Sequence, residues 1–599
     1  MSEKRLQKRD EISDEYKWKL EDMYETDELW EAECEKASQL AEKLSGFKGH
    51  LADSAATLLD FFKKQDELSY YLERIVVYAN ERSHQDTAVS KYQAYVSKAE
   101  TLTVQASGAL AFASPEILQI DDKRLESFYS ESNELVHYKR AIDEIMRQKA
   151  HTLSAAEENI LAQCGEMAAA PENIFSMFNN ADIKFPYFTD VEGNKIRITH
   201  GNFIDFLSSK DRSLRKQVFR GVYDSYKKWS NTVSMMYISK LKNDTFYARV
   251  RKYDSARAMY LSDGDIPESV YDNLIETVHA HLPALHRYMA LRKKLLGVEH
   301  LHMYDLFAPI VDNVQTTYTY DEAKKLVAKA LEPMGDEYVS TLKAGMESGW
   351  IDVYENKRSG AYSWGAYGTH PYVLLNYADN LDSVFTLAHE MGHAMHTYYS
   401  NEHQSITYAG YLIFVAEVAS TCNESLLMHY MLEHCEDENE RKYLMTHFLD
   451  GFRTTLFRQA QFAEFEHIAH RKMQKGEPVT KDVLNELWHE LNVQYYGPDM
   501  RVDDEISYEW MRIPHFYTPY YVYQYSTGYS AAVAFSKKIL EEGKPAVDKY
   551  IGNFLCGGCS KNPIELLKSA GVDMSTPKPV DDALNVFEDY LKQFETATK

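Results

Sequence analysis

The chain has 599 residues, of which 44% are hydrophobic and 26% charged, and its formal net charge at pH 7 is −25. This length allows a sizeable core, and the composition is that of an ordinary globular protein. A nucleic-acid-binding protein needs a basic surface that neutralises phosphates, whereas Lys and Arg are scattered here among Asp and Glu. We therefore expect no nucleic-acid partner.

The first residues, MSEKRLQKRDEISDEYKW, are charged and lack the apolar segment of a signal peptide. No later run approaches the roughly 18 apolar residues of a membrane-spanning helix. We expect a cytoplasmic protein without membrane contact. Cys556 and Cys559 form a CxxC pair, for which two small residues in a glycine-rich loop are a simpler interpretation than a redox or zinc pair.

From about Glu15 to Ala170, apolar residues recur at helical spacing. This pattern predicts a stack of helical hairpins, with polar breaks between apolar groups such as Leu58–Phe62 and Leu68–Ile75. Two alternating segments then flank Gly193-Asn194 and predict a β-hairpin.

The boundary before this hairpin divides the chain into an N-terminal helical-hairpin domain, residues 1–183, and a catalytic domain, residues 184–599. Helices are predicted to resume from Phe203 to Tyr253. The Gly-rich and aromatic segment Ser359–Asn380 predicts a short strand or hairpin, and Leu381–Ser400 predicts a helix that carries the motif LAHEMGHAMH.

This motif has the spacing of a metal-binding helix. The imidazoles of His389 and His393 lie about 40° apart around a helix and about 6 Å apart along its axis, so both can reach one tetrahedral metal ion. Glu390 then points beside the metal ion and can act as a general base. His396 lies about 10.5 Å along the axis from His389, which is too far for a third ligand, and we expect a structural or supporting role.

The downstream segment FVAEVASTCNESLL offers Glu417 and Glu424, which lie seven residues apart and so share one helical face. Carboxylates among Val, Ala and Leu are costly to bury unless a cation compensates them. We expect Glu417 to be the third ligand and Glu424 to orient a ligand histidine. A solvated acidic stripe is the alternative, and Glu402, in what is predicted to be an exposed loop, is the competing ligand.

Taken together, HEMGHAMH, FVAEVASTCNE, RSGAYSWG, KLLGVEHLHMYDLFAP and RIPHFYTPYYVYQYSTGYSAA resemble oligoendopeptidase F, a zinc metallopeptidase of the thimet oligopeptidase and neurolysin superfamily. The resemblance spans nearly the whole chain. It implies a mainly α fold, a large helical two-lobed body that encloses a deep substrate channel, with a small β element beside the H-E-x-x-H helix. It also implies one Zn²⁺ ion per chain, bound by His389, His393 and Glu417, and hydrolysis of internal bonds in short unstructured peptides.

The family also uses a histidine and tyrosines from a C-terminal segment to hold the substrate and the oxyanion. We expect His515 and Tyr520 to fill these roles first, and Tyr525 and Tyr523 after them. If Thr518 capped a helix with Pro519 at its first position, Tyr521 and Tyr525 would share one face while Tyr520 and Tyr523 shared another. Both groups could not then face the metal ion.

The strand-like segment PYVLLNY is expected to border the cleft and to pair with the substrate backbone, as sheet edges do. The expected substrate-binding residues are Gly360, Ala361, Tyr362 and Tyr372.

Two other functions stay open from the sequence. A zinc carboxypeptidase can also be helical and use H-E-x-x-H with a glutamate. A catalytically silent helical peptide-binding protein would retain the cleft without the chemistry, although the intact Glu390 argues against it. Either a monomer or a small homo-oligomer is consistent with the sequence, and zinc is favoured by the type of ligands.

Overall fold

The structure is a computed structural model that describes residues 9–599 apart from 190–192, 194, 312–316 and 356. The chain divides into two compact units. The first unit comprises Met1–Ala150, Thr316–Leu427 and Phe535–Gly571, and the second comprises His151–Gln315, Met428–Ala534 and Val572–Lys599. The predicted domains, residues 1–183 and 184–599, do not coincide with these units, because each unit takes three separate segments of the chain.

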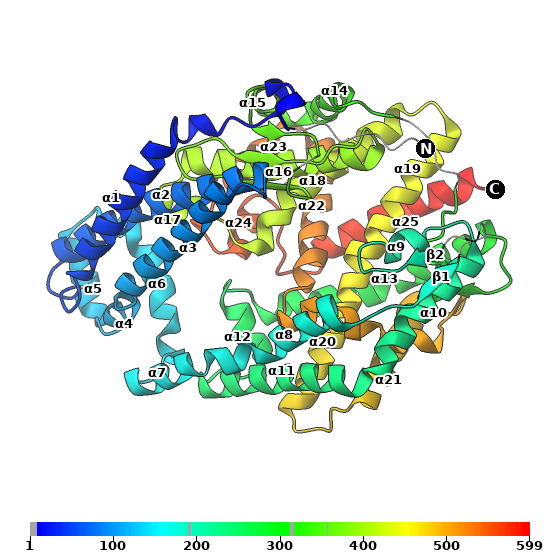
Figure 1. Cartoon of the computed structure of the whole chain (residues 1–599), viewed down its shortest axis with the longest axis horizontal. Helices are drawn as coiled ribbons and strands as arrows, with labels where there is room; N and C mark the ends of the chain where they lie inside the picture. Colours follow the sequence, from blue (N-terminus) through cyan, green and yellow to red (C-terminus); the bar gives the residue numbers. More distant parts are fainter. Residues whose placement is uncertain (1–8, 190–192, 194, 312–316, 356) are drawn as a thin grey trace. The chain divides into compact units, whose positions relative to one another are not determined.

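Both units are built mainly from helices (Figure 1), as predicted. In the described part of the first unit the helices are α1 (Asp27–Ser45), α2 (Ala55–Gln85), α3 (Ser90–Leu110), α4 (Ala113–Ile117), α5 (Asp122–Glu131), α6 (Lys139–Arg147), α14 (Tyr320–Ala330), α15 (Asp336–Glu347), α16 (Leu381–His403), α17 (Ile406–Ala409), α23 (Lys544–Lys549) and α24 (Pro563–Ser569). Helices α18 (Ile413–His434) and α22 (Tyr523–Glu542) contain two of the five points at which the chain passes between the units.

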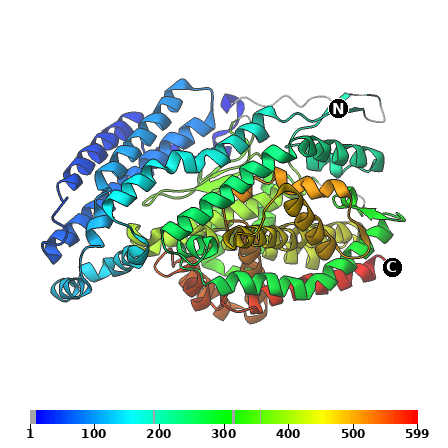
Figure 2. The same cartoon turned by 90° about the horizontal axis from the view of Figure 1, so that it is seen from below.

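The N-terminal helices α1, α2 and α3 lie side by side in both views (Figures 1 and 2) and bury one apolar cluster. Ser54 begins α2, because its side chain accepts a hydrogen bond from the backbone N–H of Thr57. The apolar groups Leu58–Phe62 and Leu68–Ile75 both lie within this one long helix. The predicted polar break between them is therefore absent, because the helix continues through the intervening polar residues 63–67.

A three-stranded sheet precedes α16 in the first unit. Its order is β4 (Ile351–Asp352), β6 (Tyr372–Leu374), β5 (Tyr362–Trp364), with β4 parallel and β5 antiparallel to the central strand β6. The predicted strand or hairpin at 359–380 is thus confirmed. Tyr372 and Leu374 belong to the buried apolar cluster of α1 to α3, which fixes the sheet against those helices.

Among the described residues of the second unit, the helices are α7 (Ala155–Gln163), α8 (Gly165–Met177), α9 (Phe203–Leu207), α10 (Arg212–Lys228), α11 (Ser230–Val250), α12 (Ala256–Ser262), α13 (Glu268–Leu295), α19 (Glu438–Gly451), α20 (Arg458–Gln474), α21 (Lys481–Tyr496) and α25 (Lys578–Ala597). The predicted helices between Phe203 and Tyr253 correspond to α9, α10 and α11.

The second unit also contains two small pairs of strands. Strands β1 (Tyr187–Thr189) and β2 (Lys195–Arg197) form the predicted antiparallel hairpin, although its turn residue Asn194 lies outside the described residues. Strands β3 (Leu301–His302) and β7 (Met500–Arg501) pair in parallel.

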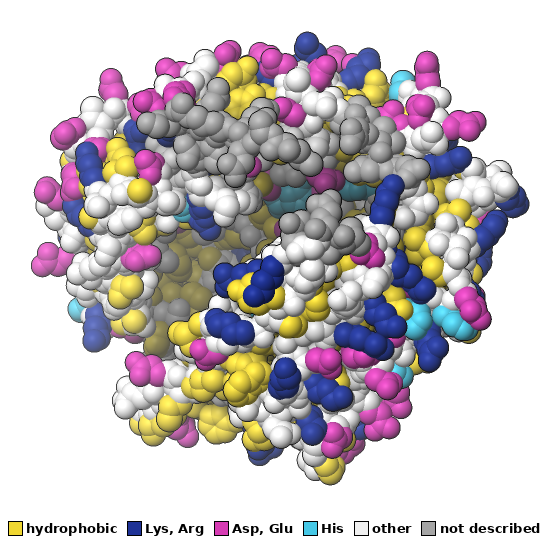
Figure 3. Space-filling view, turned by 45° about the vertical axis from the view of Figure 1, so that its right-hand side comes forward, with side chains coloured by type: hydrophobic (Ala, Val, Ile, Leu, Met, Phe, Trp, Pro, Cys, Tyr) yellow, Lys and Arg dark blue, Asp and Glu magenta, His cyan; other side chains and the backbone are white. Residues whose placement is uncertain are grey.

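The surface is mixed in charge. On the face shown in Figure 3, Asp and Glu side chains lie among Lys and Arg side chains. Over the part of the chain that the structure describes, no helix combines the length and the apolar character needed to cross a membrane.

Candidate functional site

Helix α16 carries the motif of three histidines. Its first turn is capped by Asn380, whose side chain accepts a hydrogen bond from the N–H of Ser383. Because the helix continues without a break through the motif, His389 and His393 lie one turn apart on the same face. Their rings are close, with centroids 4.9 Å apart.

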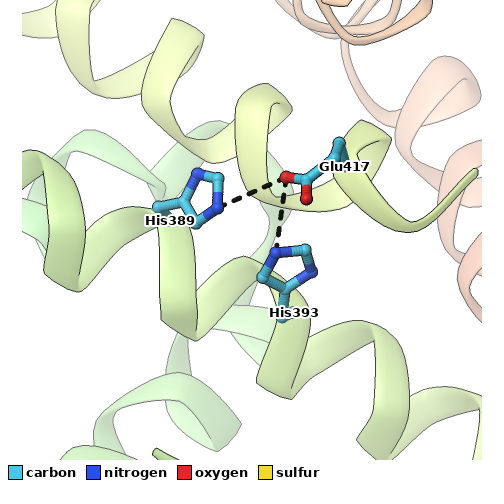
Figure 4. A group of neighbouring side chains, drawn as sticks. All are labelled: His389, His393 and Glu417. Carbon is cyan, nitrogen blue, oxygen red and sulfur yellow. Dashed lines mark ion pairs between the residues drawn. The ribbon is translucent and has the colours of Figure 1, made fainter. Parts of the chain in front are cut away.

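Helix α18 brings Glu417 to this pair. Its Oε2 atom lies 3.3 Å from Nε2 of His389 and 3.5 Å from Nε2 of His393, so one carboxylate oxygen faces both imidazoles (Figure 4). The three possible ligand atoms lie within 4.8 Å of one another. This spacing and this mixture of nitrogen and oxygen donors fit a tetrahedral metal ion with one open position.

Glu424 lies on the other side of His389 and forms a hydrogen bond with Nδ1 of that ring. An ionised carboxylate only accepts, so Nδ1 donates, and the lone pair of the neutral ring is left on Nε2, the atom that faces Glu417. Ser420 orients Glu417 in turn, because its hydroxyl donates to Oε2 of that carboxylate over 3.1 Å.

Gly392 allows α16 and α18 to approach this closely. A Cβ atom at this position would lie 2.6 Å from the Cα atom of Ser420. Asn423 joins the two helices next to this contact by donating from Nδ2 to the carbonyl of Ala388 over 3.2 Å. Gly392 therefore permits the close packing of α18 on α16.

The pKa values of His389 and Glu417 show how strongly the imidazoles and the carboxylates of this group interact. Burial alone would lower the pKa of His389, but the hydrogen bonds to Glu417 and Glu424 raise that pKa well above its usual range. Burial alone would raise the pKa of Glu417, but the hydrogen bonds from the imidazoles of His389 and His393 hold that pKa below its usual range. A positive charge is therefore favoured between the three side chains, and either a proton or a metal ion can supply it.

Glu390 projects from α16 beside the ligand pair and is 6% exposed. Burial raises its pKa, while the neighbouring His389 and His393 act in the opposite direction. A carboxylate with a raised pKa in a partly dehydrated place is suited to accept and return a proton near neutral pH.

Two other residues of α16 take no direct part in the three-residue group. His396 is fully buried and stacks on Tyr411, with ring centroids 3.8 Å apart, and neither ring nitrogen has a hydrogen-bond partner among the described residues. Burial lowers its pKa to about 3, so the ring is neutral. Glu402 lies in the last turn of α16 and not in a loop, and its side chain is exposed.

The predicted backbone-pairing segment PYVLLNY is not at the sheet edge. It contains β6, the central strand, and Tyr372 within it is fully buried, with its hydroxyl 3.5 Å from the carbonyl of Lys19. Tyr372 is therefore a core residue of the first unit, which argues against the predicted contact with substrate.

The free edge belongs to β5 instead. Val373 of β6 donates its N–H to Trp350, on the β4 side, and it is the register partner of Ser363 in β5. Because hydrogen bonding alternates along an antiparallel pair, the N–H and C=O of Ser363 point away from β6. An extended chain could pair with this edge.

The other three predicted substrate-binding residues lie at or just before β5. Gly360 is exposed with φ +90°, and its carbonyl accepts a hydrogen bond from Asn376. Ala361 is half-buried. The hydroxyl of Tyr362 lies 2.6 Å from Nδ1 of His84, so this side chain is already engaged within the first unit.

In the second unit, His515 lies in a short 3-10 turn, Pro514–Tyr517, and forms a group with Tyr521 and Tyr525. The hydroxyl of Tyr525 lies 3.4 Å from Nε2 of His515 and 3.5 Å from the hydroxyl of Tyr521. The rings of His515 and Tyr521 are nearly parallel. Burial lowers the pKa of His515. We call these three side chains the oxyanion group, after the role that is predicted for His515 and Tyr525; each of them carries a hydrogen-bond donor.

Tyr520 and Tyr523 lie elsewhere in the second unit, and both rings contact Tyr271. Tyr520 is 4% exposed, and its hydroxyl is 3.5 Å from Nδ1 of His467. The structure thus places Tyr520 with Tyr523, and away from His515, Tyr521 and Tyr525, which is the division into two groups that the sequence predicts for these tyrosines. Helix α22 itself begins at Tyr523 and not at Pro519.

The backbone before α22 has a conformation that the sequence did not reveal. Tyr520 has φ +55°, in the left-handed region that bulky residues rarely adopt. Its N–H donates to Oε1 of the buried Glu466 over 2.8 Å. Burial raises the pKa of Glu466 to about 8. This carboxyl anchors the turn that separates Tyr520 from Tyr521, and no short motif in the sequence indicates it.

Cys556 and Cys559 follow a short π-helical segment, Tyr550–Leu555, and both are free thiols. Burial raises the pKa of Cys556 to about 11, so this thiol is protonated at neutral pH. The neighbouring Gly558 packs against the backbone of Tyr408. These observations favour the interpretation of the pair as small loop residues.

Comparison with known proteins gives consistent results. Residues 206–586 match peptidase family M3, and residues 116–185 match a family described as oligopeptidase F. The chain is 50% identical to the oligopeptidase PepF of Bacillus subtilis over 592 residues, which is 98% of this chain and 88% of PepF.

Two solved structures are also similar. The crystal structure of oligoendopeptidase F from Enterococcus faecium is 38% identical, with a TM-score of 0.75, over 96% of this chain and 99% of that one. A crystal structure from Chlamydophila abortus is 33% identical, with a TM-score of 0.92, over 99% of this chain and 100% of that one.

Proposed function

Since the chain belongs to peptidase family M3 and is a hydrolase of the oligoendopeptidase F type, we propose that it is a zinc-dependent enzyme that cleaves internal bonds of short unstructured peptides. The observation that carries the metal dependence is the single Glu417 oxygen that faces Nε2 of both His389 and His393. Family membership also sets aside the alternative of a silent peptide-binding protein, and it favours an endopeptidase over a carboxypeptidase.

The residues present fit a zinc ion. Two imidazole nitrogens and one carboxylate oxygen are the ligands of many catalytic zinc sites, and Glu424 fixes the ring of His389 with Nε2 free to bind. We propose that His389, His393 and Glu417 hold one Zn²⁺ ion per chain. When bound, the ion supplies Lewis acidity, which polarises a carbonyl and acidifies water.

Glu390 carries the proton in the proposed reaction. Its buried carboxylate takes a proton from the attacking water and then gives the same proton to the amine that leaves when the peptide bond breaks. The raised pKa of Glu390 suits the first half of this task, because a carboxylate of lower pKa would accept the proton from water less readily. Glu390 therefore ends the reaction in the protonation state in which it began.

The oxyanion group supplies the hydrogen bonds that we propose for the negatively charged oxygen of the tetrahedral intermediate. The hydroxyl of Tyr525 and the imidazole of His515 already lie within 3.4 Å of each other, so both can turn toward one acceptor. One such donor is typically worth about 10² to 10³ in rate. Tyr521 takes the place in this proposal that Tyr520 had in the sequence-based prediction.

The edge of β5 is the proposed contact for the peptide backbone. Ser363 offers an N–H and a C=O on the side away from β6, next to Ala361 and Gly360. Pairing there forms hydrogen bonds with the substrate backbone and not with its side chains, which suits an enzyme that cleaves many unstructured peptides. Folded proteins lack the free extended segments that such pairing needs.

The test is a set of internally quenched peptides of about 8 to 15 residues with both ends blocked, because only an endopeptidase can cut them. We expect cleavage at internal bonds, one zinc ion per chain by elemental analysis, loss of activity with a chelator, and recovery when zinc is restored. Activity that persists in metal-free protein, or products shortened only from unblocked C-termini, would contradict the proposal.

A further inference from the structure

A pocket of about 520 Å³ lies within the first unit, between α2, α3, the edge strand β5, the C-terminal half of α16 and the loop after α17. We call it the edge pocket. Its volume falls in the range of side-chain and small-ligand sites, about 300 to 1,000 Å³. Residues that line it include Leu72, Glu73, Val76, Val77, Trp364 and Tyr411.

The edge pocket is close to the metal-ligand group along α16. Thr397 and Asn401 line the pocket and lie one and two turns after His393, which is about 6 and 12 Å along the helix axis. Tyr411 lines the pocket and also contacts α16. Its ring stacks on His396, and its hydroxyl is 2.9 Å from that of Thr397.

The same pocket adjoins the free edge of β5, because Ser363 and Trp364 both line it. An extended peptide advances about 3.3 Å per residue, and alternate side chains point to the same side. A peptide that pairs with β5 would therefore place a side chain about two to four residues from the cleaved bond at this pocket.

Glu73 gives the edge pocket a negative charge without a built-in counter-ion. No Lys, Arg, His or further acidic side chain is among its lining residues as described. Glu73 accepts one hydrogen bond, from the N–H of Tyr367 over 3.1 Å, although a carboxylate can accept about four. The surrounding protein raises its pKa by burial, and the Tyr367 N–H opposes this rise.

The edge pocket is partly apolar. Leu72, Val76, Val77 and Trp364 line the same pocket, together with the polar residues Thr103, Ser363, Thr397 and Asn401, and Glu73 itself is exposed at its rim. A Lys or Arg side chain has a complementary form, because its methylene stem packs on apolar surface while its charged end needs acceptors. A carboxylate at the rim of a partly apolar pocket therefore favours a long cationic side chain over a neutral one of similar length.

We propose that the edge pocket is a specificity subsite that binds a Lys or Arg side chain of the substrate peptide, with Glu73 as the counter-ion. This inference rests on the proposed peptidase function. It adds to that function a preference for a cationic residue at one position of the substrate. This position is about two to four residues from the cleaved bond, where a peptide paired with β5 reaches the edge pocket.

The test compares peptides, blocked at both ends, in which each position around one cleaved bond is in turn Lys or norleucine. In the wild-type protein we expect kcat/KM to be about tenfold higher for Lys at one position. Glu73→Gln should bring this ratio close to one and leave cleavage of the norleucine peptides within about twofold of wild type. Glu73→Lys should make the Lys peptide a poorer substrate than its norleucine counterpart.

Glu67→Gln is the matched control. Glu67 is an exposed carboxylate of the same helix α2, and it does not line the edge pocket. This variant removes the same charge and should keep the Lys preference. A wild-type protein without such a preference, or a preference that survives Glu73→Gln, would overturn the proposal.

Binding to the Glu390→Gln variant separates this inference from the proposed function. The edge pocket is intact in that variant, so a fluorescent Lys peptide should bind about tenfold more tightly than its norleucine counterpart even without turnover. Lys-selective binding without cleavage by the wild type would support the subsite and contradict the hydrolysis. Equal binding would overturn the subsite. A preference that depends on a free amino terminus, and disappears on acetylation, would also overturn the assignment to a side chain.

Discussion

The metal-ligand group and the oxyanion group differ in the backbone that carries them. His389, His393 and Glu417 project from two unbroken helices, α16 and α18. His515 and Tyr521 lie in irregular backbone before α22, next to a residue with φ +55°. Helical spacing places the first group from sequence alone, whereas the second depends on a turn whose direction is set by a buried carboxyl far away in the chain.

The largest effect should come from the first group. Glu390→Gln removes the proton carrier and should lower kcat by about 10² to 10⁴, because general acid and base catalysis has this range. Zinc content should stay at one per chain. The matched control is Glu402→Gln, an exposed position on the same helix, which should keep wild-type kcat and zinc. An active Glu390→Gln variant would remove this residue from the reaction.

The oxyanion group should give the next largest effect. Tyr525→Phe and His515→Ala each remove a donor and should lower kcat by about 10² to 10³, with zinc retained. Tyr529→Phe is the control on the same helix α22, since the Tyr529 ring packs on Phe452. If Tyr525→Phe and Tyr529→Phe lost activity equally, the cause would be general to the helix and not the loss of an oxyanion donor.

A smaller effect is expected behind the metal ligands. Glu424→Gln weakens the hydrogen bond that fixes His389 and should lower zinc affinity by about 10- to 100-fold. Competition with a chromophoric chelator measures this change. Glu433→Gln, an exposed position on the same helix α18, should leave the affinity unaltered. Unchanged affinity in Glu424→Gln would show that the ring of His389 needs no such support.

The smallest effect should come from Tyr520→Phe. The hydroxyl has one long contact, 3.5 Å to His467, so its loss should cost about 1 kcal/mol of unfolding free energy at most, and kcat should fall by less than about tenfold. Denaturant unfolding and steady-state kinetics measure the two quantities. A loss of 100-fold or more in kcat, at unchanged stability, would return Tyr520 to the oxyanion group.

These differences explain how far the sequence could predict the molecule. The ligand spacing on α16 follows from 3.6 residues per turn, and Glu417 stands out because its neighbours Val415, Val418 and Ala419 are apolar. The mainly helical class, the hairpin β1–β2 and the strands at 359–380 also follow from local patterns. In each case residues close in sequence decide the structure.

The errors occur where distant residues decide. Thr518 and Pro519 have the pattern of a helix start, yet Glu466 holds the N–H of Tyr520 and the helix begins only at Tyr523. Tyr372 is predicted at a sheet edge, yet β4 pairs with the other side of β6 and makes it the central strand. Strand β4 contributes only two residues, so the sequence gives little sign of it. The edge pocket is a similar case, since Glu73 and Trp364 lie almost 300 residues apart.

The contact at Gly392 has a consequence for zinc binding. The absence of a side chain there sets the gap between α16 and α18, and this gap sets how far Glu417 stands from the two imidazoles. Zinc binds carboxylate oxygen at about 2.0 to 2.2 Å, so it needs this spacing. Gly392→Ala would push Ser420, and with it Glu417, away from the imidazoles, and should therefore weaken zinc binding without a change to any ligand.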